Sequence, residues 1–112
     1  MTSLAPEDNK LVVLAKATRA RTGAAEGAAL RDLDGRTYAG ATVDLPSLQV
    51  SATGVVITMA VASGARGAEA LVVLTDGEVA ESDVSALRDF AGDGVPVLRG
   101  TPAGSIEDTR ET

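Results

Sequence analysis

The sequence contains no cysteine and no histidine among its 112 residues. Without cysteine the chain forms no disulfide and offers no thiolate to a metal ion, which is typical of a cytosolic protein. Without histidine it lacks both the commonest general base and the commonest zinc ligand. These two absences limit the possible functions more than any residue that is present.

Aromatic and basic residues are also scarce. Tyr38 and Phe90 are the only aromatic side chains, and ten basic residues stand against sixteen acidic ones, for a net charge of −6. Such a chain does not attract a phosphate backbone and has few rings on which bases could stack, so we expect no nucleic-acid partner. The small basic cluster of Lys16, Arg19 and Arg21 is best interpreted as a solvated helix face.

The sequence also lacks long apolar runs. The N-terminus, MTSLAPEDNK, does not have the basic and then apolar pattern of a signal peptide. No apolar run reaches the ~20 residues that a membrane-spanning helix needs. We therefore expect a soluble, cytoplasmic protein with no membrane partner.

The apolar residues that are present suffice for one core. Hydrophobic residues make up 45% of the sequence and are mostly alanine and valine. Because compact domains usually hold roughly 100 to 150 residues, we expect a single domain over residues 1–99 with a tightly packed core of small side chains. Residues 100–112 are polar and predict a mobile tail.

Hydrophobic periodicity and turn residues predict the order of the elements. The segment 47–63 is ambiguous, because its β-branched residues favour a strand whereas its length and the following Gly64 favour a helix. Strands joined by helices run parallel, so the order predicts a three-layer α/β/α sandwich with a mixed sheet, parallel later strands and an N-terminal β-hairpin that turns at Asp34 and Gly35. The other predicted elements are helices at 6–22 and 82–91 and strands at 25–32, 36–43, 69–75 and 94–100.

One string within this order resembles a known family. The string GAALRDLDGRTYAGATVD is similar to the opening of the cytidine deaminases, where a V-G-A-A-L strand, a D-G turn and a Y-x-G-x-N-x-E segment follow one another. The resemblance continues in the order of elements over residues 6–99. It implies a cytidine deaminase-like fold in which segment 47–63 is the central buried helix. The matching residues are Gly27, Ala28, Ala29, Leu30, Asp34, Gly35, Tyr38 and Gly40.

The resemblance also implies where a zinc site would lie. The family's first motif, a Cys or His followed by Ala-Glu at the start of the central helix, corresponds to Ser51, Ala52 and Thr53. Its second motif, P-C-x-x-C, corresponds to a segment with serine at positions 82 and 85. The three ligand positions are then Ser51, Ser82 and Ser85, and Thr53 replaces the catalytic glutamate. Neutral hydroxyls are weak zinc ligands, and threonine cannot move a proton as a carboxylate does, so we expect no metal and no cofactor.

The positions that would bind a nucleoside differ from the family as well. The Asn and Glu that hold the ribose correspond to Thr42 and Asp44, and an aromatic that lines the pocket corresponds to Ala24. A ligand would lose a stacking surface and its polar anchors. The resemblance therefore implies no tight nucleoside binding.

The serines also have structural interpretations. Serine is among the best N-cap residues, so Ser82 is expected to cap the third helix, and Ser51 and Thr53 to cap the central helix. A serine nucleophile would need Lys10 or Lys16 as its base, and both lie on an exposed helix face. We do not favour that alternative.

These observations predict a degenerate member of the cytidine deaminase family. We expect a catalytically inactive protein that acts through protein association, as a homo-oligomeric dimer or tetramer and with a protein partner that the sequence does not identify. One alternative is a module that senses a nucleoside in the relict pocket through Thr42, Asp44, Ser51 and Thr53. A second alternative is an active deaminase that works by a route without zinc.

Overall fold

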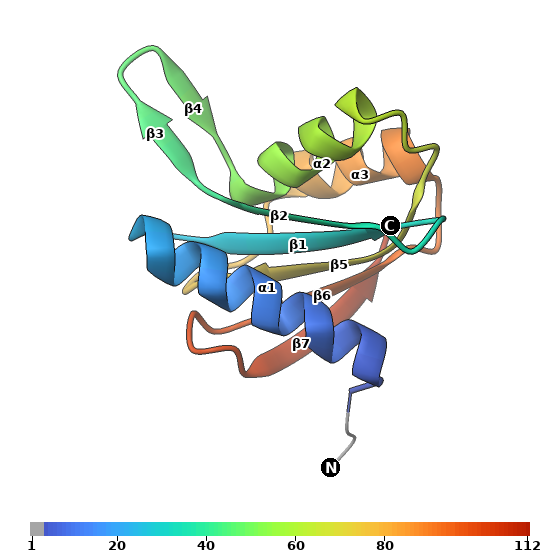
Figure 1. The fold of residues 1–112 in the computed structure, drawn as a ribbon, viewed down its shortest axis with the longest axis horizontal. Coiled ribbons are helices and arrows are strands. Elements are labelled where there is room, and N and C mark those ends of the chain that lie inside the picture. Colours follow the sequence, from blue (N-terminus) through green and yellow to red (C-terminus); the bar gives the residue numbers. More distant parts are fainter. Residues whose placement is uncertain (1–3) are drawn as a thin grey trace.

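A five-stranded sheet lies between one helix on one face and two helices on the other (Figure 1). This computed structural model describes residues 4–112, so the first three residues of the predicted domain lie outside the described part. The predicted three-layer α/β/α sandwich is confirmed. The elements are α1 (Pro6–Thr22), β1 (Gly27–Asp32), β2 (Thr37–Ala41), β3 (Val43–Leu45), β4 (Leu48–Val50), α2 (Ala52–Ala62), β5 (Ala68–Leu74), α3 (Glu81–Ala91), β6 (Pro96–Gly100) and β7 (Ile106–Glu111).

The sheet is mixed, with strand order β2-β1-β5-β6-β7. β1 pairs with β2 and with β5 in antiparallel register, and β5 pairs with β6 in parallel. The predicted hairpin and the parallel pair of later strands are therefore both present. The parallel pair arises because α3 returns the chain to the edge where β5 began.

Two apolar cores fill the spaces on either side of the sheet. Alternate side chains of a strand point to opposite faces, so neighbouring residues such as Ala28 and Ala29 contribute to different cores. The core under α1 contains Leu11, Ala15, Val72 and Leu74, among others. The core under α2 and α3 contains Leu30, Val56, Leu71, Leu87 and Val97, among others. Most of these side chains are small or branched, as the composition predicts.

Helix α1 packs directly on β1 because Gly27 has no side chain. A Cβ atom at Gly27 would lie 2.3 Å from the carbonyl oxygen of Ala15, which is closer than these two atoms can approach each other. The helix begins with Pro6 at its first turn and ends at Gly23, whose φ of 66° is left-handed. The first residue of the GAAL string is therefore needed for the contact between two layers.

The segment before α2 differs from the prediction. The predicted strand over 36–43 ends earlier, at Ala41, and Val43–Leu45 and Leu48–Val50 form a separate two-stranded ribbon. The chain turns between these strands at Pro46 and Ser47. The central helix is present, but it begins at Ala52, so only the second part of segment 47–63 is helical.

The C-terminal segment also differs from the prediction. The expectation of a tail outside the sheet does not hold for Ile106–Glu111, which forms β7 and pairs with β6 in antiparallel register. Arg99 on β6 forms ion pairs with Asp108 at 2.8 Å and with Glu107 at 3.1 Å. Charged side chains are common on edge strands because they discourage further pairing, so this strand carries no apolar alternation. Among the described residues, no helix is long and apolar enough to cross a membrane.

Candidate functional site

The candidate site is the junction where α2 and α3 begin on the same face of the sheet (Figure 1). Ser51 is the N-cap of α2, and its Oγ accepts a hydrogen bond from the Gly54 N–H at 3.0 Å. The same hydroxyl donates to Oδ1 of Asp83, on α3, at 2.8 Å. The predicted capping role of Ser51 is confirmed, and its hydroxyl also joins the two helices.

Thr53 lies in the first turn of α2 and is 1% exposed. The sequence analysis placed it where the family has its catalytic glutamate. A threonine hydroxyl is neutral and has no acidic proton to move near pH 7. The buried position beside Ser51 therefore holds no group that can act as a general acid or base.

Ser82 and Ser85 lie on α3 but are exposed to solvent, while Asp83 between them is the residue bonded to Ser51. Successive helical residues are rotated by about 100°, so Ser85 points roughly 200° away from Asp83. The structure thus does not gather the three serines into one site. The expectation that Ser82 caps α3 is wrong, because the N-cap is Ala80 and no side chain caps this helix.

Of the three positions matched to nucleoside contacts, the two with polar side chains are bonded to nearby residues. Oγ1 of Thr42 accepts the Glu26 N–H at 3.0 Å, which joins the end of β2 to the start of β1. Asp44 is exposed on β3 and accepts a hydrogen bond from Nε2 of Gln49 at 3.3 Å. Ala24 is half-buried in the loop between α1 and β1. These contacts give each polar side chain a structural partner.

The model of the family described as "Cytidine deaminase-like" matches residues 4–104. The chain belongs to the cytidine deaminase-like family. The resemblance carried by the GAAL string and the order of elements is thereby confirmed, and the match spans every described element except β7.

Solved structures show the same fold. The chain is similar to a cytidine deaminase from Burkholderia pseudomallei, with 25% identity, a TM-score of 0.75 and coverage of 100% of this chain and 92% of the other. It is also similar to cytidine deaminases from Mycobacterium leprae, with 21% identity, TM-score 0.74 and coverage of 96% and 94%, and from Bacillus anthracis, with 16% identity, TM-score 0.72 and coverage of 96% and 84%. Among curated proteins, no relative matches the sequence.

In this cytidine deaminase-like chain the donor atoms at the helix junction do not fit zinc. Zinc in proteins is held by thiolate, imidazole and carboxylate groups, usually four ligands in a tetrahedron. The junction offers a serine hydroxyl and the carboxylate of Asp83, and these two groups are bonded to each other. Within residues 4–112, no cluster of three or more His, Cys, Asp or Glu side chains is arranged to hold a metal ion.

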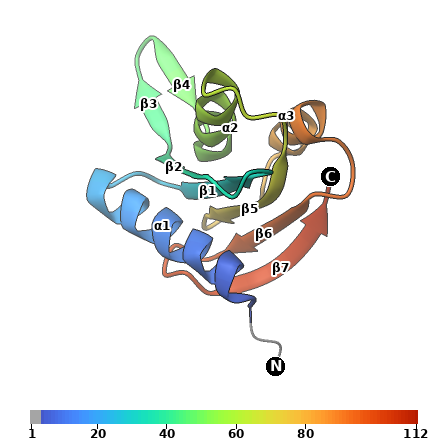
Figure 2. The ribbon, with the colours of Figure 1, turned by 45° about the vertical axis from the view of Figure 1, so that its right-hand side comes forward.

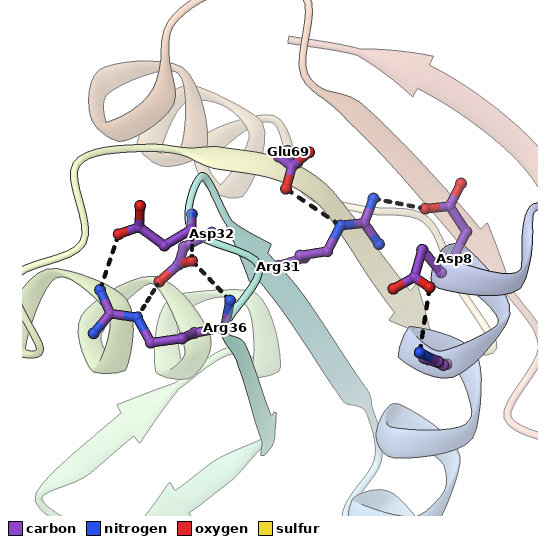
Figure 3. Close-up of polar contacts among 8 residues, drawn as sticks. Asp8, Arg31, Asp32, Arg36 and Glu69 are labelled. Atoms are coloured by element: carbon purple, nitrogen blue, oxygen red, sulfur yellow. Dashed lines mark hydrogen bonds and ion pairs between the residues drawn. The ribbon is translucent and has the colours of Figure 1, made fainter.

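A buried polar network at the β1–β2 turn was not anticipated from the sequence (Figure 3). Asp32 is 0% exposed. Its Oδ1 accepts the backbone N–H groups of Asp34 and Arg36, both at 2.9 Å. Its Oδ2 accepts the Tyr38 hydroxyl at 2.8 Å and Nε of Arg36 at 3.2 Å. The carboxylate therefore holds the Asp-Gly turn and the start of β2 together.

This network shifts the acidity of both buried groups. Burial alone would raise the pKa of Asp32, but the hydrogen bonds from Tyr38 and from the Arg36 and Asp34 N–H groups outweigh it, so that the pKa lies below its usual value. The hydrogen bond to Asp32 raises the pKa of the Tyr38 hydroxyl, and burial raises it further. At neutral pH Asp32 is ionised and Tyr38 is a neutral donor, which is a structural rather than a catalytic arrangement.

A hollow of about 510 Å³ lies beside the start of α3, between the β5–α3 connection and strands β6 and β7. Its two arginines are both paired, Arg99 with Asp108 at 2.8 Å and Arg110 with Glu81 at 2.6 Å. The pKa of Glu81 is lowered by its hydrogen bond and charge interaction with Arg110. These ion pairs join β7 to β6 and to α3. The charged side chains that line the hollow therefore have a structural role.

Proposed function

We propose that this chain is a catalytically inactive member of its family that acts through association with further copies of itself. The proposed inactivity rests on the helix junction. There Thr53 is buried, and the Ser51 hydroxyl donates a hydrogen bond to the Asp83 carboxylate. Hydrolytic deamination in this family needs a metal-activated water and a carboxylate that moves its proton. Among the described residues, the junction has no set of side chains that could hold such a metal, and its one carboxylate, that of Asp83, is bonded to Ser51.

The same bond supports a register for the relict metal positions. Two ligands in a C-x-x-C spacing lie three residues apart, and Asp83 is the α3 residue in contact with Ser51. The position three residues before Asp83 is Ala80, the N-cap of α3. We therefore propose that the former ligand positions are Ser51, Ala80 and Asp83, in place of the serine pair at 82 and 85.

Two triple variants test this register. S51C/A80C/D83C is expected to bind one zinc ion per chain after dialysis, because three thiolates would meet at the junction. S51C/S82C/S85C, with the same number of cysteines, is expected to bind none stably, because two of its thiolates would face solvent. Elemental analysis and the absorbance of the cobalt forms measure both. Zinc in the second variant and not in the first would instead support Ser51, Ser82 and Ser85 as the former ligand positions.

The inactive state is tested with the unmodified protein. We expect no change in the ultraviolet absorbance of cytidine or deoxycytidine during incubation, with or without added zinc, and no zinc in the purified protein by elemental analysis. A cytidine deaminase assayed in parallel shows that the conditions support turnover. Turnover by this chain, or stoichiometric zinc in it, would overturn the proposal.

Nucleoside sensing is tested by thermal shift. A ligand present at about 100 times its dissociation constant adds about 2.7 kcal/mol to the stability of the folded state. We expect no shift with any nucleoside, because Thr42 and Asp44 are bonded to their neighbours. A shift that T42A abolishes would support the sensor hypothesis in place of pure association.

A further inference from the structure

Three Asp-Gly pairs occur in the sequence, at residues 34–35, 76–77 and 93–94. Such a pair can modify itself, because the backbone nitrogen of the glycine and the side-chain carboxyl carbon of the aspartate close a five-membered ring when they join. Glycine favours the reaction because it has no Cβ atom to obstruct the approach and leaves the backbone free to turn. The rate at each pair therefore depends on how firmly the fold holds these two groups.

The reaction needs no reagent other than water. The glycine nitrogen attacks the carboxyl carbon, a C–N bond forms, and the amide proton and the carboxyl hydroxyl group leave together as water. The product is a succinimide ring. Water then adds to one of the two ring carbonyls and breaks its C–N bond. The ring opens either back to aspartate or to isoaspartate, in which the main chain passes through the former side-chain carbonyl.

Both reacting groups are held in the 34–35 pair. The Gly35 N–H donates to the main-chain oxygen of Asp32 at 3.1 Å. The Asp34 carboxylate forms an ion pair with Arg36 at 3.3 Å. The nitrogen must give up its hydrogen bond, and the carboxyl group must leave its partner, before the ring can close. These contacts raise the barrier and make the 34–35 pair slow to react.

Both groups are also held in the 93–94 pair. The Gly94 N–H donates to the main-chain oxygen of Thr112 at 3.1 Å, which ties the glycine to the residue just after β7. The Asp93 carboxylate forms an ion pair with Arg88 at 3.2 Å. We expect this pair to react slowly for the same reason.

The 76–77 pair lies in the connection from β5 to α3 (Figure 2) and is held more weakly. The Gly77 N–H donates to the side-chain Oγ1 of Thr75 at 3.1 Å, and a turn closed by a threonine hydroxyl is a weak restraint. The Asp76 side chain is exposed and forms no ion pair or hydrogen bond within residues 4–112. We infer that Asp76 is the site at which this protein converts spontaneously to isoaspartate, and that the Thr75 hydroxyl slows the conversion.

Trypsin separates the three pairs, because cleavage after arginine places them in the peptides 32–36, 67–88 and 89–99. The folded protein is incubated for several weeks at neutral pH in heavy-oxygen water, which enters the carboxyl group each time a succinimide opens. After digestion in ordinary water, mass spectrometry measures the label in each peptide. We expect peptide 67–88 to be labelled about tenfold faster than the other two, the effect of one or two hydrogen bonds on the barrier. Equal labelling of the three peptides, or faster labelling of another, would overturn the inference.

Unfolded protein is the control for the effect of the fold. In concentrated urea the hydrogen bonds and ion pairs are lost, so the three peptides are expected to be labelled at similar rates. The same preference for peptide 67–88 in urea would mean that the local sequence decides the rate, which would overturn the argument from the contacts. An endoproteinase that cleaves before aspartate and not before isoaspartate locates the product at position 76.

Single variants test the two residues on either side of Asp76. T75V is expected to speed the labelling of peptide 67–88 several-fold, because the Gly77 N–H loses its acceptor, whereas T75S is expected to keep the wild-type rate. G77A is expected to slow it. A Cβ atom at Gly77 would meet only Oγ1 of Thr75, at 4.0 Å, so alanine fits there. The other two peptides are internal controls for an intact fold, and an unchanged rate in T75V would overturn the role of Thr75.

This inference does not depend on the proposed function. Analytical ultracentrifugation of the unmodified protein tests self-association separately, and a species heavier than the chain mass of 11.3 kDa is expected whether or not Asp76 reacts. A monomer would overturn self-association and leave the labelling result unchanged.

Discussion

Replacement of Asp32 by asparagine should be strongly destabilising, although it changes one atom and removes no volume. The wild-type carboxylate is 0% exposed and accepts four hydrogen bonds, two on each oxygen. In D32N the amide oxygen can keep the two bonds from the Asp34 and Arg36 N–H groups. The amide nitrogen would then face two donors, the Tyr38 hydroxyl and Nε of Arg36, where the carboxylate has an acceptor.

The magnitude follows from these contacts. A hydrogen bond to a charged group contributes about 1.5 to 3 kcal/mol. The Tyr38 hydroxyl can rotate and accept from the new amide, so part of its bond is recovered, whereas the bond from Arg36 is lost. Arg36 is half-exposed and regains water, which reduces its share of the cost. We therefore expect D32N to lower the free energy of unfolding by about 2 to 4 kcal/mol, a large part of the roughly 5 to 15 kcal/mol typical of a domain.

Urea unfolding followed by circular dichroism measures this change, with an unchanged m value as the check that the folded state is intact. Y38F removes only one donor and is expected to cost about 1 to 2 kcal/mol, because the carboxylate keeps its other three bonds. In D32N/Y38F the two losses should not add, since the substituted groups share a bond. A loss below about 0.5 kcal/mol in D32N, the level of an ordinary surface change, would refute the reasoning.

Four further predictions concern pH, packing, the C-terminal strand and the helix junction. Because the folded pKa of Asp32 lies below its usual value of 3.8, its contribution to stability is present above that pH and is lost as the pH falls through the folded pKa; urea unfolding should show an acid loss that D32N lacks. G27A should cost about 1 to 3 kcal/mol or more in the same assay, since its methyl group would force α1 away from β1. Deletion of residues 106–112 should lower the melting temperature and cause light scattering, because it uncovers the edge of β6; an unchanged melting curve would mean that this segment is a tail after all. S51A should cost about 1 kcal/mol by loss of the N-cap, whereas S82A, at an exposed position without a capping bond, should be close to neutral.

The family and the layer order could be predicted from the sequence because their signals are local. A tight turn at Asp34 and Gly35, a glycine at position 27 and apolar strands of the right length are each visible within a few residues. The central helix was assigned correctly from the resemblance, although its first residues became β4. Its start could not be read from hydrophobicity, because apolar residues occur on both sides of it, Leu48 and Val50 in β4 and Val55 and Val56 in α2.

The candidate site was predictable only in part. Ser51 lies at the junction, where it is bonded to Asp83, whereas Ser82 and Ser85 are exposed to solvent on α3. Two serines three residues apart resemble a relict C-x-x-C pair, whereas the contact of Asp83 with Ser51 leaves no such signal in the sequence. The register depends on which side of a helix faces its neighbour, and that is a contact between residues 32 positions apart.

By itself the sequence determined the chemistry that this protein lacks, because no fold can supply a thiolate or an imidazole to a chain that has neither residue. It also determined the family, through a short string whose turn and glycines have local physical reasons. Only the tertiary structure decided that Ile106–Glu111 is an edge strand, that Asp32 is buried and that the β3–β4 ribbon exposes Leu45 and Leu48. Each of these depends on pairing or burial between distant segments, and a charged strand or a buried carboxylate leaves no periodic pattern in the sequence from which it could be recognised.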